Sequence, residues 1–287
     1  MVQTPVGWTA LVTGASQGIG RAAALRLAAI GAHVVLVARD PERVRAAAES
    51  IERATGNPVL DALTADLSTL SGVRFVAQRF LEANDRLDVL LNNVGGLFGH
   101  RALTVDGFER TVALNHLCPF LLTALLLPAL RAGAGRVVNV SSSAHRWRGL
   151  DLDDMHSQRA GMGPGGFGAY ARSKLMNLLF TYELARRERG TGVTANAMHP
   201  GIVASAFGSG NGRWMTFALR LARPWMRSPQ EGADTAVFLA TAAEAQGVTG
   251  RYYVDRQPVR SSPASYDRAL QRGLWERSAA MVGLSMD

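Results

Sequence analysis

The chain has 287 residues, of which 47 % are hydrophobic and 19 % charged, so it is too apolar for a disordered protein and can build one large core. Its formal net charge is +8, but the basic residues are spread along the chain rather than grouped, and we expect no nucleic-acid partner. A single cysteine, Cys118, excludes an intrachain disulfide and suits a reducing compartment, so we expect a cytoplasmic protein.

The apolar segments of the chain do not predict insertion into a membrane. Residues 1–8 lack the basic leader and apolar stretch of a secretory signal. The longest apolar run, residues 118–130, is shorter than the about 20 residues that span a bilayer, and it contains two prolines. We therefore interpret this run as a buried helix and expect a soluble protein without an integral membrane segment.

Apolar segments of strand length alternate with helical patterns as far as about residue 255. The expected strands are Thr9–Thr13, His33–Ala38, Val59–Thr64, Leu87–Leu91, Arg136–Ser141, Val193–His199 and Arg251–Val254. The expected helices are residues 18–30, 41–55, 69–84, 106–131, 168–189 and 230–243, with a C-terminal helix at about 263–284. Short, continuously apolar strands between helices predict an α/β fold, a doubly wound Rossmann-type parallel sheet of about seven strands with helices on both faces. No repeat or Pro/Gly-rich linker divides residues 1–287, so we expect a single domain.

Two segments are too long for ordinary connections between strands and helices. Residues 144–167 are polar and rich in glycine, and residues 206–229 carry tryptophan and methionine among several arginines. Long loops in compact domains are often functional. We interpret residues 206–229 as a lid over an apolar substrate, and contact with a membrane surface is the alternative.

The first expected strand runs into a glycine-rich turn, Thr13-Gly14-Ala15-Ser16-Gln17-Gly18-Ile19-Gly20, which a helical pattern follows. Glycines at such a turn let the backbone approach a pyrophosphate, and N–H groups at the positive end of the helix dipole favour the anion. At the first strand–helix junction of an alternating chain, the turn predicts a dinucleotide site. Its expected contacts are Gly14, Ser16, Gln17, Gly18, Ile19 and Gly20.

The end of the second expected strand distinguishes the two nicotinamide dinucleotides. An acidic residue there holds the ribose 2′-hydroxyl of NAD, whereas an arginine suits the 2′-phosphate of NADP. Arg39 stands at this strand end, and Asp40 follows it. Because a guanidinium binds phosphate through two parallel hydrogen bonds, Arg39 favours NADP(H) over NAD(H). An exposed arginine that merely flanks a helix is the alternative interpretation.

Lys174 is the one lysine among 31 basic residues, which indicates a chemical requirement for a compact ammonium. Tyr170 stands four residues earlier in a helical stretch, so the two side chains share one face of the helix. A nearby ammonium favours phenolate, and we expect it to lower the tyrosine pKa from about 10. A phenol adjusted in this way can act as a general acid or base. The same spacing also occurs as a surface pair, so the catalytic interpretation gains weight from Ser142 at the end of an expected strand.

These motifs, in this order, resemble those of the short-chain dehydrogenase/reductase family over almost the whole chain. Beyond the glycine-rich turn, the resemblance rests on Asp66-Leu67, Asn92-Asn93-Val94-Gly95, Asn115, Ser141-Ser142, Tyr170-Ala171-Arg172-Ser173-Lys174 and His199-Pro200-Gly201-Ile202-Val203. More narrowly, the chain is similar to the retinol-dehydrogenase-like group in Asn115-His116-Leu117, Val138 to His145, His199-Pro200-Gly201 and Leu274-Trp275-Glu276. The resemblance implies an NADP(H)-dependent oxidoreductase that interconverts an alcohol and an aldehyde or ketone.

The resemblance also implies a role for each catalytic residue. Tyr170 exchanges a proton with the substrate oxygen, and Ser142 hydrogen-bonds that oxygen. Lys174 holds the nicotinamide ribose and lowers the tyrosine pKa. Asn115 anchors a water that relays protons through Lys174.

Other positions follow from the same resemblance. Ser142 is preferred to its neighbours Ser141 and Ser143 because it stands at the family's position. The interval between Ser142 and Tyr170 is longer than in many relatives, so we expect residues 146–167 to shape the mouth of the site. Further cofactor contacts implied by the resemblance are Asp66, Leu67, Asn92, Asn93, Gly95, Pro200, Gly201, Val203 and Ser205, besides Tyr170 and Lys174.

Two other functions remain open on the same fold. A regulatory member that binds NADP(H) without chemistry is the main alternative, although Ser142, Tyr170 and Lys174 are all present. An epimerase or dehydratase would usually carry a longer C-terminal domain and a Gly-x-x-Gly-x-x-Gly turn. The six histidines lack the close spacing of metal ligands, so we expect no metal. We expect a hydrophobic small-molecule substrate, and a homo-oligomer is possible through the helices near 106–131 and 168–189.

Overall fold

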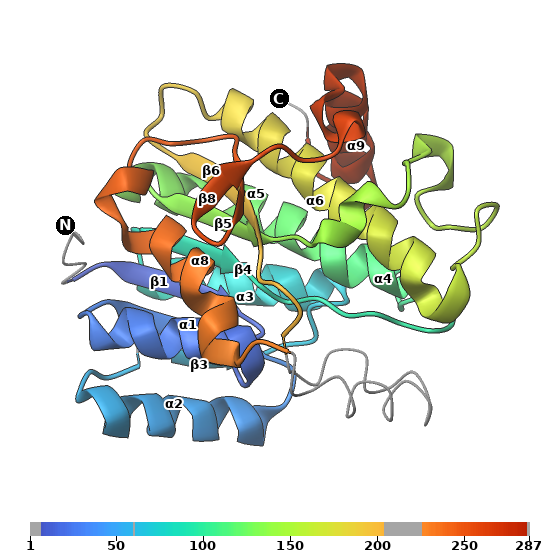
Figure 1. Cartoon of the computed structure of the whole chain (residues 1–287). Coiled ribbons are helices and arrows are strands. Elements are labelled where there is room, and N and C mark those ends of the chain that lie inside the picture. The colour runs from blue at the N-terminus through green and yellow to red at the C-terminus, as the bar shows by residue number, and fades with distance from the viewer. Residues whose placement is uncertain (1–6, 60, 204–225, 286–287) are drawn as a thin grey trace.

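A sheet of eight strands crosses the computed structural model, which describes residues 7–59, 61–203 and 226–285 (Figure 1). The strand order is β3-β2-β1-β4-β5-β6-β7-β8; β1 to β7 run parallel, and β8 pairs antiparallel with β7. The strands are β1 (Thr9–Thr13), β2 (His33–Ala38), β3 (Asp61–Thr64), β4 (Val89–Asn92), β5 (Arg136–Val140), β6 (Thr194–His199), β7 (Tyr252–Val254) and β8 (Gln257–Val259). The order reverses between β1 and β4, and sheets of this kind bind ligands in the crevice at the carboxyl ends of the strands that flank the reversal.

Helices cover both faces of the sheet. They are α1 (Gly18–Ala29), α2 (Pro41–Thr55), α3 (Leu70–Ala83), α4 (Arg110–Val112), α5 (Cys118–Gly133), α6 (Phe167–Arg187), α8 (Pro229–Thr241) and α9 (Arg268–Val282). A π-helical turn, η1 (Ala113–Leu117), joins α4 to α5, and two 3₁₀ turns that bear on the site are η2 (Ser143–Arg146) and η7 (Pro263–Tyr266). Residues of α1, α2 and α8 form one buried cluster with the sheet, and residues of α3, α5, α6 and α9 form the other.

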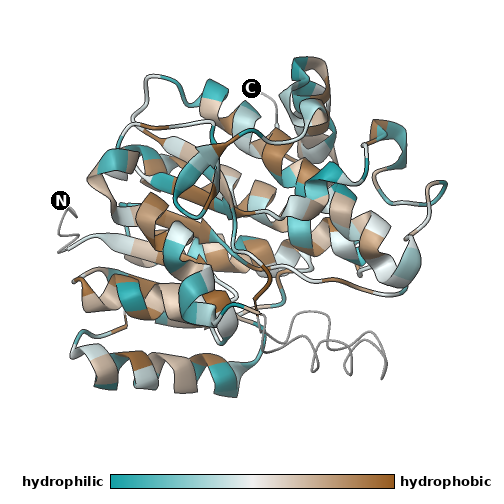
Figure 2. Cartoon of the chain, in the orientation of Figure 1, coloured by the Kyte–Doolittle hydropathy of each residue, from teal (hydrophilic) through white to brown (hydrophobic). Residues whose placement is uncertain are grey.

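The strands are apolar along their length because helices cover both faces of the sheet. In β2, Val34 and Leu36 belong to the cluster with α1 and α8, whereas Val35 and Val37 belong to the cluster with α3 and α5. All four side chains are at most 1 % exposed. Figure 2 shows apolar residues along the central strands and polar residues on the outer helices and loops. Continuously apolar strands are typical of a parallel sheet between two helical layers.

Capping residues set where the helices begin and end. The Asp40 carboxylate accepts a hydrogen bond from the Arg43 N–H at 3.0 Å at the start of α2. Gly56 ends the same helix in the left-handed conformation, with φ +67°. Ser228 and Glu231 form a reciprocal capping box at the start of α8. The bounds expected from the sequence for both helices are confirmed to within two residues.

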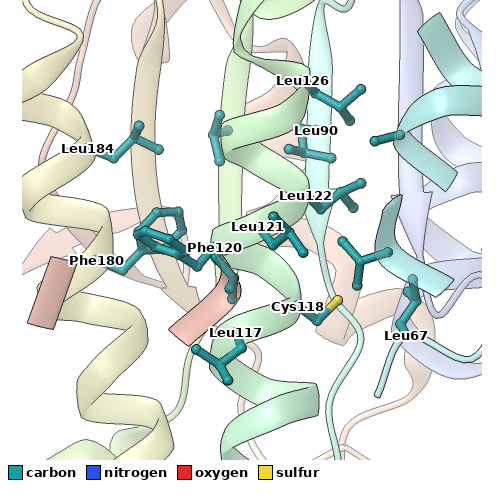
Figure 3. Close-up of a cluster of buried hydrophobic side chains, with 14 of the residues drawn as sticks. Leu67, Leu90, Leu117, Cys118, Phe120, Leu121, Leu122, Leu126, Phe180 and Leu184 are labelled. Atoms are coloured by element: carbon teal, nitrogen blue, oxygen red, sulfur yellow. The ribbon is translucent and has the colours of Figure 1, made fainter. Parts of the chain in front are cut away.

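Aromatic rings from three helices build the core on the α5 and α6 side of the sheet. The Phe120 ring on α5 lies 5.5 Å from Phe180 on α6 and 5.0 Å from Trp275 on α9, measured between ring centroids. Leucines of η1 and α5 extend this cluster along the helix (Figure 3): Leu117, Leu121, Leu122 and Leu126. The C-terminal helix α9 is thereby anchored to the body of the fold.

One helical stretch in the described part of the chain, Arg110–Gly133, is long and apolar enough to cross a bilayer, with a mean hydropathy of 1.7. Its most apolar window is 72 % buried inside the protein. Length and composition alone do not separate a bilayer span from a core helix, so this finding is weak evidence for a membrane. The prediction that residues 118–130 form a buried helix is confirmed.

Three details of the fold differ from the prediction. The sheet has eight strands rather than about seven, because the chain turns back after β7 to form β8. Both turn residues, Asp255 and Arg256, are left-handed, with φ +51° and +62°, but neither is the glycine or asparagine that usually marks such a hairpin. The helix expected at 106–131 starts later and contains the π-helical turn η1. The helix expected at 263–284 is divided into η7 and α9, and Asp267 caps α9.

We predict that Phe120→Ala lowers the free energy of unfolding by about 3–5 kcal/mol, because it opens a cavity between three helices. Urea denaturation followed by circular dichroism measures the change. Phe75→Ala on α3 is the matched control, since that ring is 45 % exposed and its loss should cost at most about 0.5 kcal/mol. Equal losses in the two variants would contradict the packing around α5.

Candidate active site

Thr13 and Asn93 join the carboxyl ends of β1 and β4, beside the turn that starts α1. The Asn93 N–H donates to Thr13 Oγ1 at 3.0 Å, and the Asn93 side-chain amide donates to the Thr13 carbonyl at 2.8 Å. The Val94 N–H donates to Thr13 Oγ1 at 3.1 Å, and this hydroxyl donates to the Leu91 carbonyl at 3.2 Å. The two strand ends are thus held together at the floor of the site.

The glycine-rich turn leaves the start of α1 open to an anion. Gly14 and Gly18 are left-handed, with φ +66° and +58°, and a Cβ atom on Gly20 would lie 2.4 Å from the Gly14 carbonyl oxygen. Gln17 precedes α1 and makes no side-chain hydrogen bond to its first turn. The N–H groups of that turn, which includes Ile19, have no side-chain cap and lie at the positive end of the helix dipole. This cradle fits the pyrophosphate of a dinucleotide, and the adjoining Ser16 is partly exposed beside it.

Arg39 lies exposed directly after β2. In the described part of the chain its guanidinium takes part in no hydrogen bond or ion pair. Asp40, the neighbouring acid, is already used: its carboxylate caps α2 and pairs with Arg43 at 3.2 Å. The strand end therefore presents an exposed guanidinium without a partner among the described residues, while the neighbouring carboxylate is committed to the helix.

Asp66 and Leu67 follow β3 on the same edge of the sheet. The exposed Asp66 carboxylate accepts hydrogen bonds from the Ser68 N–H at 2.9 Å and from its hydroxyl at 2.8 Å. Leu67 is 4 % exposed and belongs to the core on the α3 side. The Leu67 side chain is thus mainly a packing residue, and its backbone remains at the strand end where the adenine contact is expected.

The segment after β6 approaches the start of α1 from the other side. A Cβ atom on Gly232 in α8 would lie 2.7 Å from Val203 Cγ2 and 3.2 Å from Ile19 Cγ1, so the three residues pack together. Pro200 and Gly201 lead from β6 into this contact, and Gly201 is left-handed with φ +82°. Val203, one of the expected cofactor positions, therefore lies beside the α1 turn. Ser205 and the greater part of the expected lid, residues 206–225, lie outside the described residues.

A side-chain hydrogen bond joins Ser142, at the end of β5, to Tyr170 in α6. The two neighbouring serines are placed differently. Ser141 is buried, and its hydroxyl donates to the Lys174 carbonyl at 2.9 Å, while Ser143 is exposed. Of the three serines, Ser142 is the one whose hydroxyl meets the phenol.

The Lys174 ammonium lies inside the protein, one helical turn from Tyr170. It is 3 % exposed, and its Nζ donates to the Val140 carbonyl at 2.9 Å. The same Nζ lies 5.6 Å from the centre of the Tyr170 ring. A Cβ atom on Gly95 would lie 3.5 Å from it, so the loop after β4 passes close to the ammonium. Tyr170 and Lys174 do share one face of α6, as their spacing indicates.

Asn115 is completely buried in the π-helical turn η1. Its side-chain oxygen accepts from the Gly96 N–H at 2.8 Å, and its amide donates to the Gly96 carbonyl at 2.9 Å and to the Ser173 hydroxyl at 3.0 Å. These bonds tie the loop after β4 to α6. A Cβ atom on Gly95 would lie 3.2 Å from the Asn115 oxygen, so Asn115 and Lys174 flank the same glycine. Irregular π-helical turns are frequent at functional sites.

Comparison with known proteins agrees with this geometry. Residues 8–150 match the family model described as short chain dehydrogenase. Human retinol dehydrogenase 13 is 39 % identical over 284 residues, which cover 97 % of this chain and 85 % of that protein. This chain belongs to the short-chain dehydrogenase/reductase family. A protein of Streptomyces sp. (strain C5), provisionally named a daunorubicin C-13 ketoreductase, is 42 % identical over 96 % of this chain and 93 % of its own length.

Solved structures of family members share the fold. An uncharacterized protein from Mycobacterium paratuberculosis has a TM-score of 0.78 at 32 % identity, with 100 % of this chain and 97 % of that one covered. The Pseudomonas aeruginosa RhlG/NADP active-site complex has a TM-score of 0.68 at 30 % identity, with coverage of 91 % and 97 %. A metagenomic short-chain oxidoreductase in complex with NADP has a TM-score of 0.66 at 29 % identity, with coverage of 91 % and 100 %. The predicted Rossmann-type fold and retinol-dehydrogenase-like group are confirmed, and the protein is an oxidoreductase of alcohols and carbonyl compounds that uses a nicotinamide dinucleotide.

Burial shifts the two titratable groups of the family's catalytic pair in opposite directions. Desolvation raises the pKa of Tyr170 to about 12, and the hydrogen bond with Ser142 offsets part of this rise. Desolvation lowers the pKa of Lys174 to about 8. The Tyr170 pKa thus lies above its ordinary value of about 10 rather than below it as expected, and the effect of Lys174 on it stays a prediction. The phenolate would lose its hydration on burial, so the neutral phenol is favoured.

Aromatic rings line the approach from the long 144–167 segment to the phenol. Phe167, at the start of α6, lies 6.4 Å from the Tyr170 ring, and Trp147 lies 6.5 Å from Phe167, between ring centroids. Trp147 is 68 % exposed and Phe167 39 % exposed. Buried Arg172 holds the same segment to α6 by donating to the Ser157 hydroxyl at 3.1 Å. The rings of Trp147 and Phe167 thus lie between solvent and Tyr170, and the role of residues 146–167 at the mouth of the site stays a prediction.

Some supporting residues carry too weak a signal to be assigned from the sequence. Thr13 opens the glycine-rich motif, but its bonds to the β4 end become visible with the coordinates. Val140 acts through its backbone carbonyl, which leaves no trace in the side-chain pattern. His145 lies within a segment similar to the retinol-dehydrogenase-like group, yet its spacing from the other motifs in the sequence indicates no function for it. Among the residues that the structure describes, no three His, Cys, Asp or Glu side chains gather to hold a metal ion.

We predict that Lys174 makes the stability of the cofactor-free protein depend on pH. Between about pH 8 and 10.5 the folded protein has released this proton while the unfolded chain keeps it, so the free energy of unfolding rises with pH. The contribution is at most about 1.4 kcal/mol per pH unit. Urea denaturation of the wild type and of Lys174→Met from pH 7 to 10 measures it, since the variant lacks the contribution. Parallel curves would contradict a lowered Lys174 pKa.

Proposed function

We propose that the protein is an NADP(H)-dependent oxidoreductase that interconverts an alcohol and an aldehyde or ketone of a hydrophobic small molecule, with Tyr170 as the general acid and base. The observation that carries the proposal is the hydrogen bond between the partly exposed Ser142 and Tyr170 side chains, beside the buried Lys174 ammonium. This group of side chains stands at the carboxyl ends of the strands, on the edge of the sheet that holds the open start of α1. A proton donor and a dinucleotide cradle at one edge of the sheet are what carbonyl reduction requires.

In the reducing direction, Tyr170 donates its phenolic proton to the substrate oxygen, and the Ser142 hydroxyl donates a hydrogen bond to the same atom. NADPH, when bound, supplies the hydride. A pKa of about 12 keeps the phenol protonated at neutral pH, and it remains a sufficient acid for an alkoxide, which is a stronger base than phenolate. Lys174 and a water anchored near Asn115 then return a proton to the phenolate. The neutral phenol favours reduction over alcohol oxidation, which would need the phenolate at the start.

Two observations support NADP(H) as the cofactor. Arg39 extends from the end of β2 without a partner among the described residues, and the Asp40 carboxylate that could favour NAD is committed to capping α2. Two related solved structures are described as NADP complexes. A 2′-phosphate at this position would pair with the guanidinium through charge-assisted hydrogen bonds.

A hydrophobic substrate is supported by the exposed rings of Trp147 and Phe167, which lead to the Tyr170 phenol. The relatives are named for an alcohol, retinol, and for reduction of a ketone, daunorubicin, which agrees with an organic alcohol or carbonyl compound as the substrate. The cytoplasmic location, a homo-oligomer and the lid role of residues 206–229 stay predictions from the sequence.

Tyr170→Phe removes the proton donor and keeps the ring, so we predict at least an about 100-fold loss of turnover. The assay follows NADPH absorbance with a panel of aldehydes and ketones that runs from short aliphatic to polycyclic. NADPH affinity, measured by fluorescence titration, should change by less than about 3-fold, a difference below 0.7 kcal/mol.

Tyr253→Phe is the control, because it removes a tyrosine hydroxyl on β7 from a ring that packs in the cluster with α1 and α8. It should keep wild-type turnover. Full activity of Tyr170→Phe would overturn the mechanism. Binding of NADPH by the wild type without turnover of any member of the panel would instead favour the regulatory alternative.

Arg39→Ala should weaken NADPH binding by about 10- to 100-fold, since hydrogen bonds to charged groups contribute about 1.5–3 kcal/mol. NADH binding should stay unchanged because NADH lacks the 2′-phosphate. Isothermal titration with each cofactor measures the effect. Arg45→Ala removes an exposed arginine from α2 nearby and serves as the control for net charge. An equal loss of affinity for NADPH and NADH would contradict the assignment of Arg39 to the 2′-phosphate.

A further inference from the structure

His145 lies directly behind Ser142 and is almost completely buried, with 1 % of its surface exposed. Its Nδ1 lies 2.6 Å from the Ser142 carbonyl oxygen, and its Nε2 lies 3.0 Å from the Ser262 N–H. The Tyr252 ring packs edge-to-face against the imidazole at 5.0 Å between centroids. Both ring nitrogens are therefore bound to the main chain, one on each side of the ring.

The two main-chain partners fix the tautomer of this histidine. The Ser262 N–H can only donate, so Nε2 must be the unprotonated nitrogen that accepts. The Ser142 carbonyl can only accept, so Nδ1 must carry the proton. The ring is therefore neutral, and burial, which lowers the pKa of His145, keeps it so. A charged ring would turn an Nε2–H toward the Ser262 N–H, which is a contact between two donors.

The Ser142 peptide is held at several points, and the imidazole supplies the shortest bond. The Ser142 hydroxyl oxygen accepts from the Ala144 N–H at 3.2 Å, and the Ser142 carbonyl accepts from the His145 backbone N–H at 3.2 Å. The ring bond to the same carbonyl is 2.6 Å long. Since the peptide orientation of Ser142 sets where its side chain points, a bond to the carbonyl also directs the hydroxyl.

The other end of His145 is attached to the loop between β8 and η7. Besides the Ser262 N–H, this loop is bound by the adjacent Arg146, whose guanidinium donates to the Arg260 carbonyl. Ser262 itself is 7 % exposed. A C-terminal loop is thereby joined to the end of β5 through two consecutive side chains.

We infer that His145 is a positioning residue: its Nδ1–H holds the Ser142 carbonyl so that the Ser142 hydroxyl stays directed at the Tyr170 phenol, and the Ser262 N–H selects the tautomer that can do this. The inference rests on the proposed roles of Ser142 and Tyr170. His145 bonds to the main chain of Ser142, and the bond between the two reacting hydroxyls is made by Ser142 and Tyr170 themselves. It therefore acts through Ser142 and takes no proton from the substrate.

Two substitutions distinguish the two hydrogen bonds of the imidazole, because each variant keeps one of them and loses the other. In His145→Asn the side-chain amide reaches the position of Nδ1, so the donor to the Ser142 carbonyl is kept and the acceptor for the Ser262 N–H is lost. In His145→Gln the longer amide places its oxygen near the position of Nε2, so the acceptor is kept and the donor is lost. Both variants remove one buried hydrogen bond each, so a merely structural histidine predicts equal effects in the two.

We expect His145→Gln to lower kcat by about 10- to 100-fold with little change in KM, because a misdirected hydroxyl affects the chemical step. His145→Asn should stay within about 3-fold of the wild-type kcat. The isotope effect with NADPH deuterated at the transferred hydrogen should rise in His145→Gln and stay unchanged in His145→Asn. Thermal unfolding should give both variants the same Tm. Equal kcat values, or losses of activity that follow Tm, would overturn the inference.

Nuclear magnetic resonance tests the inference without an activity assay. A negative result would therefore overturn the role of His145 and leave the proposed function untouched. In protein with ¹⁵N-labelled histidine, the signals missing from His145→Gln identify His145 and should show a neutral ring protonated at Nδ1 at pH 7. The ¹³C shift of the Ser142 carbonyl should move in His145→Gln and not in His145→Asn. A ring protonated at Nε2 or at both nitrogens, or equal Ser142 shifts in the two variants, would overturn the role of His145 even if the enzyme reduces no tested carbonyl.

Discussion

The contact between Ser142 and Tyr170 depends on how firmly the end of β5 is tied to α6. Three of the buried bonds between these two elements are the Ser141 hydroxyl to the Lys174 carbonyl, the Lys174 Nζ to the Val140 carbonyl, and the Asn139 amide to the Thr181 hydroxyl. Each group would be costly to leave unpaired inside the protein, so the three bonds favour one register between strand and helix. At its carboxyl edge a parallel sheet has backbone groups without a strand partner. The side-chain hydrogen bonds that pair these groups also position the reactive side chains.

The same burial sets the chemistry of the pair. It raises the pKa of the Tyr170 phenol to about 12 and lowers that of the Lys174 ammonium to about 8, so each neutral form is favoured relative to water. At neutral pH the phenol keeps its proton, and the ammonium remains charged close to its titration range. A proton can then leave the phenol toward an alkoxide and be replaced from a neighbour that releases protons easily. Burial thus suits a proton donor for reduction.

The sequence predicts most of the strands and helices because the buried strands are continuous apolar runs and several helix starts carry caps such as Asp40. The reactive groups follow from the spacing of Tyr170 and Lys174 and from the order of the motifs. The π-helical turn around Asn115 leaves no periodic signal, and the turn into β8 uses Asp255-Arg256 without the usual glycine. The direction of the Tyr170 pKa shift depends on whether desolvation of the phenolate outweighs its attraction to a nearby positive charge. The spacing of Tyr170 and Lys174 in the sequence gives the size of neither effect.

The C-terminal part of the chain supplies support rather than reactive groups. The Ser262 N–H binds His145 within the η2 turn that Ser142 caps. The Ser278 hydroxyl lies 2.7 Å from His116 Nε2, next to Asn115. Both histidines are buried, and desolvation lowers the pKa of each imidazole. The family model covers residues 8–150, whereas these two supports come from residues 262 and 278. A change in the packing of α9 would therefore act on Asn115 through His116, and a change in the loop before η7 would act on Ser142 through His145. The Tyr170 phenol, the Lys174 ammonium and the dinucleotide cradle would stay the same.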